Sequence, residues 1–172
     1  KTENSEESCC KPFVSTAHSA IICGATGCGK TEFVLDLLEN EYYQFFTYII
    51  IICPTIKHNK AYQRKWLFAD GKVVLYNPYD VEAEDPLNET IEMWHKFFED
   101  QGEPVLFIID DCSAAKGLTR KKQALSELAF SGRHANCSVW VLTQKYNSVL
   151  TDFREQVKWL ALFYCKDRKN FK

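Results

Sequence analysis

The stretch Gly24-Ala25-Thr26-Gly27-Cys28-Gly29-Lys30-Thr31 has two glycines separated by four residues and followed directly by lysine and threonine. Glycine lets the backbone curl until successive N–H groups point at a phosphate, and a helix beginning here presents its positive end to the same anion. In this pattern Lys30 reaches the β- and γ-phosphates, and the Thr31 hydroxyl binds Mg²⁺. The stretch therefore predicts a site for a nucleoside triphosphate, with ATP and Mg²⁺ as the expected ligands.

Apolar residues on both sides of the loop favour this interpretation over an ordinary glycine-rich turn. Residues 19–23 form a short apolar run that leads into the loop. Phe33, Val34, Leu37 and Leu38 follow it at helical spacing. The motif requires a strand, a loop and a helix in this order, and the sequence predicts all three.

The bulk properties indicate a single globular domain. The chain has 172 residues, 46% of them hydrophobic, and a net charge of −2. We expect a polar lead-in over residues 1–17 and one domain over residues 18–172. The weak negative charge gives no overall attraction to nucleic acid, so any such contact has to come from local patches.

The cysteines favour an intracellular protein with reduced thiols. Most of the eight lie in or beside apolar runs, and none has the spacing of a zinc site, so no structural metal site is expected. No apolar stretch approaches 18 residues, and the acidic N-terminal segment does not resemble a signal peptide, so the protein is expected to be soluble.

Two fully apolar runs indicate strands buried on both faces of a parallel sheet, residues 48–52 and 105–109. Asp85-Pro86 predicts the start of a helix, and residues 119–131 predict another. Further strands are expected at 73–76, 138–143 and 159–164. Alternation of buried strands and helices predicts an α/β fold, the three-layer sandwich of P-loop NTPases with a mostly parallel sheet.

Polar residues at two strand ends complete the predicted site. Residues 105–109 run into Asp110-Asp111, and the strand after it ends in Thr143-Gln144. We expect Asp110 to support Mg²⁺ opposite Thr31, and Asp111 or Gln144 to position the attacking water. A strand ending in a polar group after the acidic strand is typical of hydrolases in which it lies between the phosphate-loop strand and the acidic strand.

Two alternatives stay open from the residues alone. A P-loop kinase acting on a nucleotide or other small molecule would need an arginine-bearing lid, for which the segment around Arg120 is the only candidate. A regulatory nucleotide-binding module with little hydrolysis is the other. The guanine signature of GTPases is absent, because Asn59-Lys60-Ala61-Tyr62 departs from it at the fourth position.

The ordered set of the phosphate loop, Asp110-Asp111, Gly132-Arg133-His134 and Thr143-Gln144 resembles the FtsK–HerA-type genome-packaging ATPases. The similarity spans roughly residues 21–157 and is greatest to the branch of poxviruses, other large DNA viruses and Polinton transposons. Many members of the wider superfamily have Asp-Glu where this chain has Asp110-Asp111, so the second carboxylate of this chain is on a shorter side chain.

The resemblance implies a Mg²⁺-dependent ATPase, a DNA translocase that assembles as a homo-oligomeric, hexameric ring and pumps double-stranded DNA into a capsid. It implies work in the host cytoplasm or nucleus, with the virion as a further location, and capsid or portal components as further partners, but no membrane. Ring ATPases commonly complete each site with an arginine from the neighbouring subunit. Arg133 is the first candidate by matching position, and Arg154 is the second.

Local basic clusters are the candidate DNA contacts. They lie at residues 57–66, 116–122 and 166–169. Each suits sequence-independent contacts to phosphates, although a solvated surface is the more common role of such a cluster.

Overall fold

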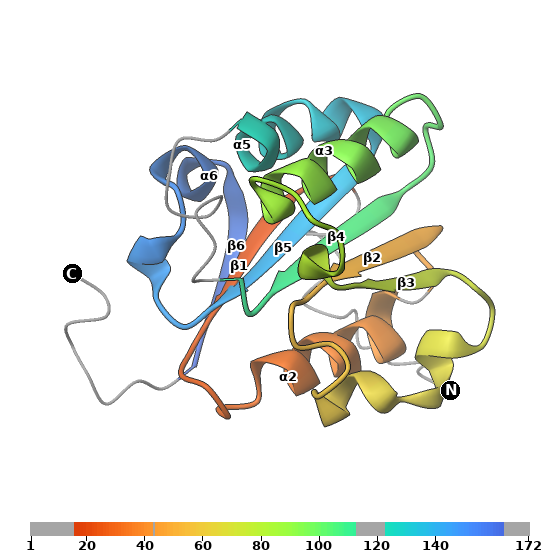
Figure 1. The fold of residues 1–172 in the computed structure, drawn as a ribbon, viewed down its shortest axis with the longest axis vertical. Helices are drawn as coiled ribbons and strands as arrows, with labels where there is room; N and C mark the ends of the chain where they lie inside the picture. Colours follow the sequence, from red (N-terminus) through yellow and green to blue (C-terminus); the bar gives the residue numbers. More distant parts are fainter. Residues whose placement is uncertain (1–15, 43, 113–122, 164–172) are drawn as a thin grey trace, which may run out of the picture.

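In the part of the chain that the structure describes, six strands form one sheet in the order β3-β2-β4-β5-β1-β6 (Figure 1). The structure is a computed structural model, and it describes residues 16–42, 44–112 and 123–163. The strands are β1 (Ser19–Cys23), β2 (Tyr48–Ile52), β3 (Val73–Tyr76), β4 (Val105–Asp110), β5 (Cys137–Thr143) and β6 (Val157–Leu162). Every pair of neighbours is parallel. The predicted parallel α/β fold is therefore confirmed.

Helices cover both faces of this sheet. The α-helices are α2 (Lys30–Leu37), α3 (Pro86–Phe98), α5 (Gln123–Phe130) and α6 (Thr151–Glu155). Short turns of 3-10 helix are η2 (Lys60–Gln63), η3 (Lys65–Phe68), η4 (Pro78–Asp80), η5 (Gly132–Ala135) and η6 (Tyr146–Ser148), and a π-helical turn, η1 (Leu38–Tyr42), continues α2.

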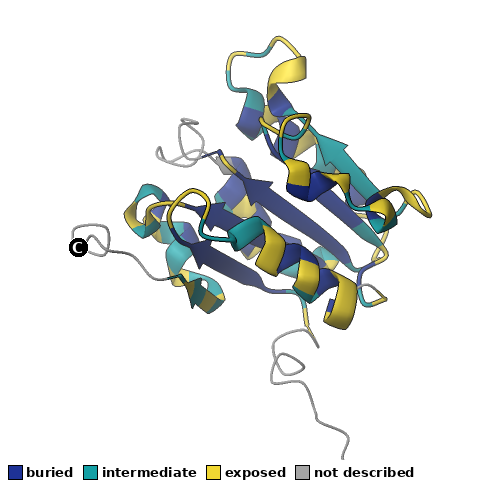
Figure 2. Ribbon diagram, turned by 90° about the horizontal axis from the view of Figure 1, so that it is seen from below, coloured by how far each residue is buried: buried dark blue, intermediate teal, exposed yellow. Residues whose placement is uncertain are grey.

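Two apolar clusters, one on each face of the sheet, hold the two helical layers against it. On one face of the sheet, residues of α2, η2 and η3 pack against side chains such as Ile22 and Trp140. On the other face, α3, α5 and α6 pack against side chains such as Ile21 and Phe107. The central strands are buried on both faces (Figure 2), because a parallel sheet between two helical layers has no face left for water.

The strand order places β5 between β1 and β4, as the strand-end residues predicted. Cys23 at the end of β1 lies beside Thr143 at the end of β5. Leu142 of β5 lies beside Asp110 at the end of β4. The carboxyl ends of these three strands therefore meet at one edge of the sheet, and the residues that follow them converge there.

Most predicted elements agree with the structure, with small differences at their ends. Asp110 belongs to β4 because it pairs with Leu142 of β5. The last strand begins at Val157, two residues before its predicted start, because Val157 already pairs with Ser19. Asp85 and Pro86 stand at the start of α3 as expected.

Several expectations fall outside the described residues. They are most of the predicted lead-in, the start of the helix predicted from residue 119, the segment around Arg120, the end of the last predicted strand, and the basic clusters at 116–122 and 166–169. Within the described residues, no helix combines the length and apolar character needed to cross a membrane.

Candidate functional site

The loop between β1 and α2 has the backbone geometry that its glycines predict. Gly27 and Gly29 have φ angles of 76° and 96°, in the left-handed region that favours glycine. Gly24 is needed for a different reason, because a Cβ atom there would lie 2.6 Å from the sulfur of Cys28 and 2.7 Å from Cβ of Phe163. Substitution at any of these positions would therefore disturb the loop.

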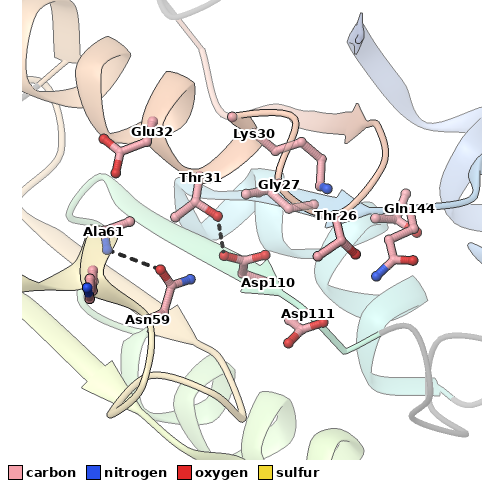
Figure 3. A pocket seen from close by; sticks show the side chains of 14 residues that line it. Thr26, Gly27, Lys30, Thr31, Glu32, Asn59, Ala61, Asp110, Asp111 and Gln144 are labelled. Atoms are coloured by element: carbon pink, nitrogen blue, oxygen red, sulfur yellow. Dashed lines mark hydrogen bonds between the residues drawn. The ribbon is translucent and has the colours of Figure 1, made fainter. Parts of the chain in front are cut away.

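A pocket of about 430 Å³ lies at the carboxyl edge of the sheet, between this loop and the ends of β4 and β5. Figure 3 shows Lys30, Asp110 and Asp111 between Asn59 and Ala61 on one side and Thr26 and Gln144 on the other. Its lining residues are Thr26, Gly27, Gly29, Lys30, Thr31, Glu32, Asn59, Lys60, Ala61, Asp110, Asp111, Leu142, Thr143 and Gln144.

The Lys30 ammonium donates hydrogen bonds within its own loop. Its Nζ lies 2.7 Å from the carbonyl oxygen of Gly24 and 3.0 Å from that of Ala25. Because Lys30 lines the pocket, these contacts hold its positive charge where a bound anion would meet it. Lys30 also lowers the pKa of Asp110 through its charge, as the smallest of the effects on that carboxyl.

Asp110 is the buried acid of the pocket. Its Oδ2 accepts hydrogen bonds from the Thr31 hydroxyl, at 2.9 Å, and from the Tyr62 hydroxyl. Burial is the main effect and raises its pKa above the ordinary value, although both hydrogen bonds act in the opposite direction. The surrounding protein thus compensates the negative charge of Asp110 only in part, and a bound cation would stabilise that charge.

The donor atoms around Asp110 fit Mg²⁺. Thr31 and Asp110 supply hard oxygen ligands, the type that Mg²⁺ prefers. In the described part of the chain, no group of three or more His, Cys, Asp or Glu side chains could hold a metal ion. Mg²⁺ does not require one, because it keeps several waters and usually binds through one or two carboxylates together with substrate phosphates.

Asp111 lies on the rim of the pocket with an unusual backbone conformation. Its φ angle is 56°, and its side chain is exposed. Its Oδ2 accepts a hydrogen bond from the Thr55 hydroxyl at 3.1 Å. The exposed carboxylate is therefore oriented toward the segment that follows β2.

Gln144 follows β5 directly, and its exposed side chain lines the pocket (Figure 3). Its position depends on the pairing of β5 between β1 and β4, because that register brings the end of β5 next to the phosphate loop. The structure thus brings the two candidate water-positioning residues, Asp111 and Gln144, into the same pocket.

The two candidate arginines lie outside this pocket. Arg133 belongs to η5, which precedes β5, and its Nη2 donates to Oε1 of Gln156 at 3.0 Å. The guanidinium of Arg154 stacks over the Tyr146 ring, with its carbon 5.1 Å from the ring centroid, and donates to the hydroxyl of Thr151 at 2.9 Å. Neither side chain is among the described residues that line the pocket.

Sequence reasoning missed the contribution of the connection between β2 and β3. Thr55 contacts Asp111, Tyr62 contacts Asp110, and residues 59–61 line the pocket. Only part of the basic cluster at 57–66 is an open surface: Tyr62 is buried and Arg64 pairs with carboxylates of α2 and η1. Its lysines, Lys57, Lys60 and Lys65, are exposed. A mixture of charged and aromatic residues carries no signal for these contacts.

Two buried thiols lie beneath the acidic residues. Burial raises the pKa of Cys53 to about 11, and it raises the pKa of Cys112 well above the ordinary value. Both thiols therefore stay protonated and unreactive at neutral pH.

Comparison with known proteins identifies the family. The family model described as "Poxvirus A32 protein" matches residues 11–169. No curated protein is significantly similar in sequence.

Solved structures share the fold at low sequence identity. The genome packaging NTPase B204 from Sulfolobus turreted icosahedral virus 2, in complex with AMP, has a TM-score of 0.68 and 16% identity over 90% of this chain and 78% of that chain. EssC (ATPases 2 and 3) from Geobacillus thermodenitrificans has a TM-score of 0.64 and 12% identity over 92% of this chain and 34% of that chain. The N-terminal domain of zonular occludens toxin from Neisseria meningitidis has a TM-score of 0.59 and 16% identity over 88% of this chain and 79% of that chain.

Proposed function

We infer that this chain, which belongs to the poxvirus A32 protein family, is an ATP-hydrolysing motor subunit that translocates double-stranded DNA during the packaging of a viral genome. The observation that carries the proposal is the position of β5 between β1 and β4, because it brings Gln144 to the phosphate loop and Asp110-Asp111. The shared fold with the genome packaging NTPase B204, solved with AMP, AMPPCP and ATP-γS, supports nucleotide as the ligand.

In the proposed reaction the loop binds the triphosphate. Backbone N–H groups of residues 24–31 and the start of α2 hold the phosphate oxygens, and the Lys30 ammonium exchanges its carbonyl contacts for the β- and γ-phosphates. Thr31 and Asp110 would hold Mg²⁺. Bound there, the cation neutralises the charge that develops on the phosphate oxygens.

Hydrolysis then needs an oriented water. Water oxygen forms a bond to the γ-phosphorus, the bond from that phosphorus to the ADP oxygen breaks, and the water releases a proton, giving ADP and phosphate. Asp111 or Gln144 would orient this water from the pocket rim, and only Asp111 could also accept its proton. Arg133, or else Arg154, would approach from a neighbouring subunit in a hexameric ring.

The decisive measurement is ATP hydrolysis with and without linear double-stranded DNA. We expect DNA to stimulate hydrolysis by the wild-type protein, and we expect Lys30→Ala or chelation of Mg²⁺ to abolish it. Lys96→Ala is the matched control, because Lys96 is an exposed lysine on α3, outside the nucleotide pocket.

Other outcomes would point to other functions. Transfer of phosphate to a small acceptor, without any response to DNA, would indicate a kinase. Tight nucleotide binding with negligible hydrolysis at all DNA concentrations would indicate a regulatory module. Either result would contradict the motor.

A further inference from the structure

Two hydroxyl groups from different parts of the chain donate to the same oxygen of Asp110. The Thr31 hydroxyl, at the start of α2, donates to Oδ2 at 2.9 Å. The Tyr62 hydroxyl, from η2, donates to the same atom. Thr31 belongs to the phosphate-loop pattern, whereas Tyr62 belongs to the connection between β2 and β3 and has no place in that pattern.

This second hydrogen bond is closed off from water. Tyr62 is 3% exposed and Asp110 is 4% exposed. Opening a hydrogen bond between buried partners leaves both without a replacement, so each holds the other in one orientation. Both donors use Oδ2, which leaves Oδ1 of Asp110 for other ligands.

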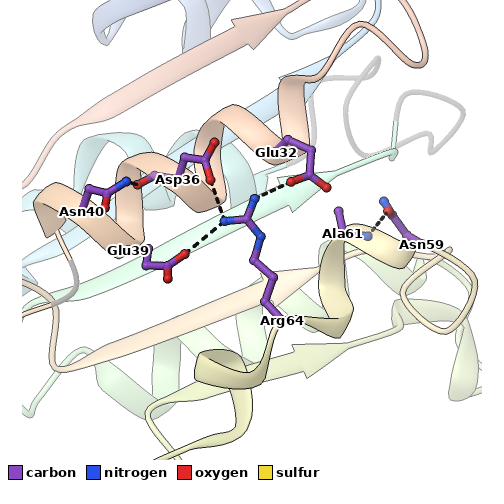
Figure 4. Close-up of polar contacts among 7 residues, drawn as sticks. All are labelled: Glu32, Asp36, Glu39, Asn40, Asn59, Ala61 and Arg64. Carbon is purple, nitrogen blue, oxygen red and sulfur yellow. Dashed lines mark hydrogen bonds and ion pairs between the residues drawn. The ribbon is translucent and has the colours of Figure 1, made fainter.

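The backbone that carries Tyr62 is tied to the phosphate-loop helix. Arg64, two residues further on, pairs with carboxylates on α2 and η1, at 2.7 Å from Asp36 and 3.2 Å from Glu39, and also pairs with Glu32 (Figure 4). The side chain of Asn59 caps η2 by accepting from the backbone N–H of Ala61 at 3.1 Å. The Tyr62 hydroxyl is therefore held in a defined position relative to the helix that carries Thr31.

We propose that Tyr62 is a positioning residue for the metal–nucleotide site, whose hydroxyl fixes the orientation of the Asp110 carboxylate that would hold the cation. This inference rests on the proposed function only in that it takes a Mg²⁺–nucleotide complex as the ligand of the pocket. Hydrogen bonds that orient a metal-supporting carboxylate strengthen metal binding, and their loss typically weakens it about 10- to 100-fold.

The test is the Mg²⁺ dependence of nucleotide binding by a Tyr62→Phe variant. This change removes the hydroxyl and keeps the ring in the apolar cluster beside α2. Calorimetric titration with AMPPCP at a series of Mg²⁺ concentrations gives nucleotide affinity without hydrolysis. We expect metal-free affinity to stay within about twofold, and the Mg²⁺ concentration for half-maximal tightening to rise about tenfold, since Thr31 still holds Asp110. Tyr79→Phe is the control, because Tyr79 is 51% exposed and lies outside the pocket.

Three results would overturn the proposal. One is an unchanged Mg²⁺ dependence in Tyr62→Phe. Another is a parallel loss of metal-free and metal-dependent affinity together with a lower melting temperature, because that pattern belongs to a purely structural side chain. The third is a wild-type protein whose nucleotide affinity does not respond to Mg²⁺. A wild-type protein that binds Mg²⁺–AMPPCP but shows no DNA-stimulated hydrolysis would contradict the motor alone, and the shifted Mg²⁺ dependence of Tyr62→Phe would still support this inference.

Discussion

Asp111 combines backbone strain with an exposed carboxylate. A residue other than glycine in the left-handed region costs on the order of 1–3 kcal/mol, although aspartate tolerates it better than most side chains. Asp111, with a φ angle of 56°, comes directly after β4, a strand that is buried along its whole length. Strain of this kind persists where the surrounding structure imposes it, and it concentrates at functional sites. The geometry therefore makes Asp111 a candidate for the group that acts on water.

An Asp111→Asn variant isolates the charge of this side chain. Asparagine also tolerates the left-handed region, and its amide oxygen still accepts from Thr55. We expect the free energy of unfolding in urea to change by less than about 0.5 kcal/mol. If Asp111 is the base, ATP hydrolysis falls by a factor of about 10² to 10⁴.

Gln144→Ala is the companion variant, because Gln144 is the rival for positioning water in the same pocket. Full hydrolysis by Asp111→Asn, with a large loss in Gln144→Ala, would reject Asp111 as the base and assign the water to Gln144. Nucleotide affinity measured in parallel separates a loss of chemistry from a loss of binding.

At the scale of the elements, His18 joins the start of β1 to β5. Its backbone N–H donates to the Ser138 hydroxyl at 3.1 Å, and its Nε2 accepts from Nε1 of Trp140 at 3.0 Å. Its Nδ1 lies 2.9 Å from the carbonyl oxygen of Thr16. Only the neutral ring, with a proton on Nδ1, satisfies both of its ring contacts, because protonation would set an N–H of His18 against the N–H of Trp140.

This arrangement predicts that stability falls on mild acidification. Burial is the main cause that lowers the pKa of His18 below its ordinary value of 6.5. The unfolded chain therefore takes up a proton at higher pH than the folded chain does. The contribution of His18 to the free energy of unfolding is fully present above pH 6.5. It is lost as the pH falls from 6.5 toward the pKa of the folded state, by at most about 1.4 kcal/mol per pH unit.

Urea unfolding of His18→Gln between pH 7.5 and 5 checks this prediction. We expect the variant to be less stable at pH 7.5 by about 1–2 kcal/mol, from the altered hydrogen bonds, and to lose less stability on acidification. His58→Gln, at an exposed histidine, is the control. Asp110 affects stability in the direction opposite to His18. Burial raises the pKa of Asp110 above 3.8, so its contribution to the free energy of unfolding is lost as the pH rises. An identical slope in wild type and His18→Gln would refute the assignment to His18.

At the scale of the whole molecule, the phosphate loop and Arg133 lie at opposite edges of the sheet. Arg133 precedes β5, whereas Gln144 follows it. The strand has seven residues, and at about 3.3 Å per residue its ends are about 20 Å apart. Arg133 therefore cannot reach the phosphates of its own subunit without refolding, although a neighbouring subunit could present it to another subunit's pocket.

Mixing two inactive variants tests a role of Arg133 in trans. We expect Arg133→Ala alone to lower hydrolysis by about 10³-fold or more, as the loss of an arginine finger does. Mixtures with Lys30→Ala should recover part of the activity, because some sites combine an intact loop with an intact arginine. Sedimentation with nucleotide checks whether the two variants assemble with each other. Intact assembly without any recovery would remove Arg133 from consideration and leave Arg154.

Local patterns predicted much of the fold and the central part of the site. The apolar runs of β2 and β4 are continuous, so their strands could be placed from sequence. The loop at residues 24–31 and the acids at the end of β4 carry their chemistry in short motifs. Residues 59–64 escaped prediction because two 3-10 turns have no sustained periodicity, and the same composition would suit an exposed basic surface.

Short-range sequence was sufficient for the strand–loop–helix of the nucleotide site and for the carboxylates that follow a buried strand, because those features depend on residues close together in the chain. The hydrogen bond from Tyr62 to Asp110 joins residues 48 positions apart, and the ion pairs of Arg64 with Asp36 and Glu39 join residues 28 and 25 positions apart. Both depend on which strands pair and which side chains pack between the layers. Such contacts between distant residues exist only once the whole sheet has assembled, so the tertiary structure was needed to reveal them.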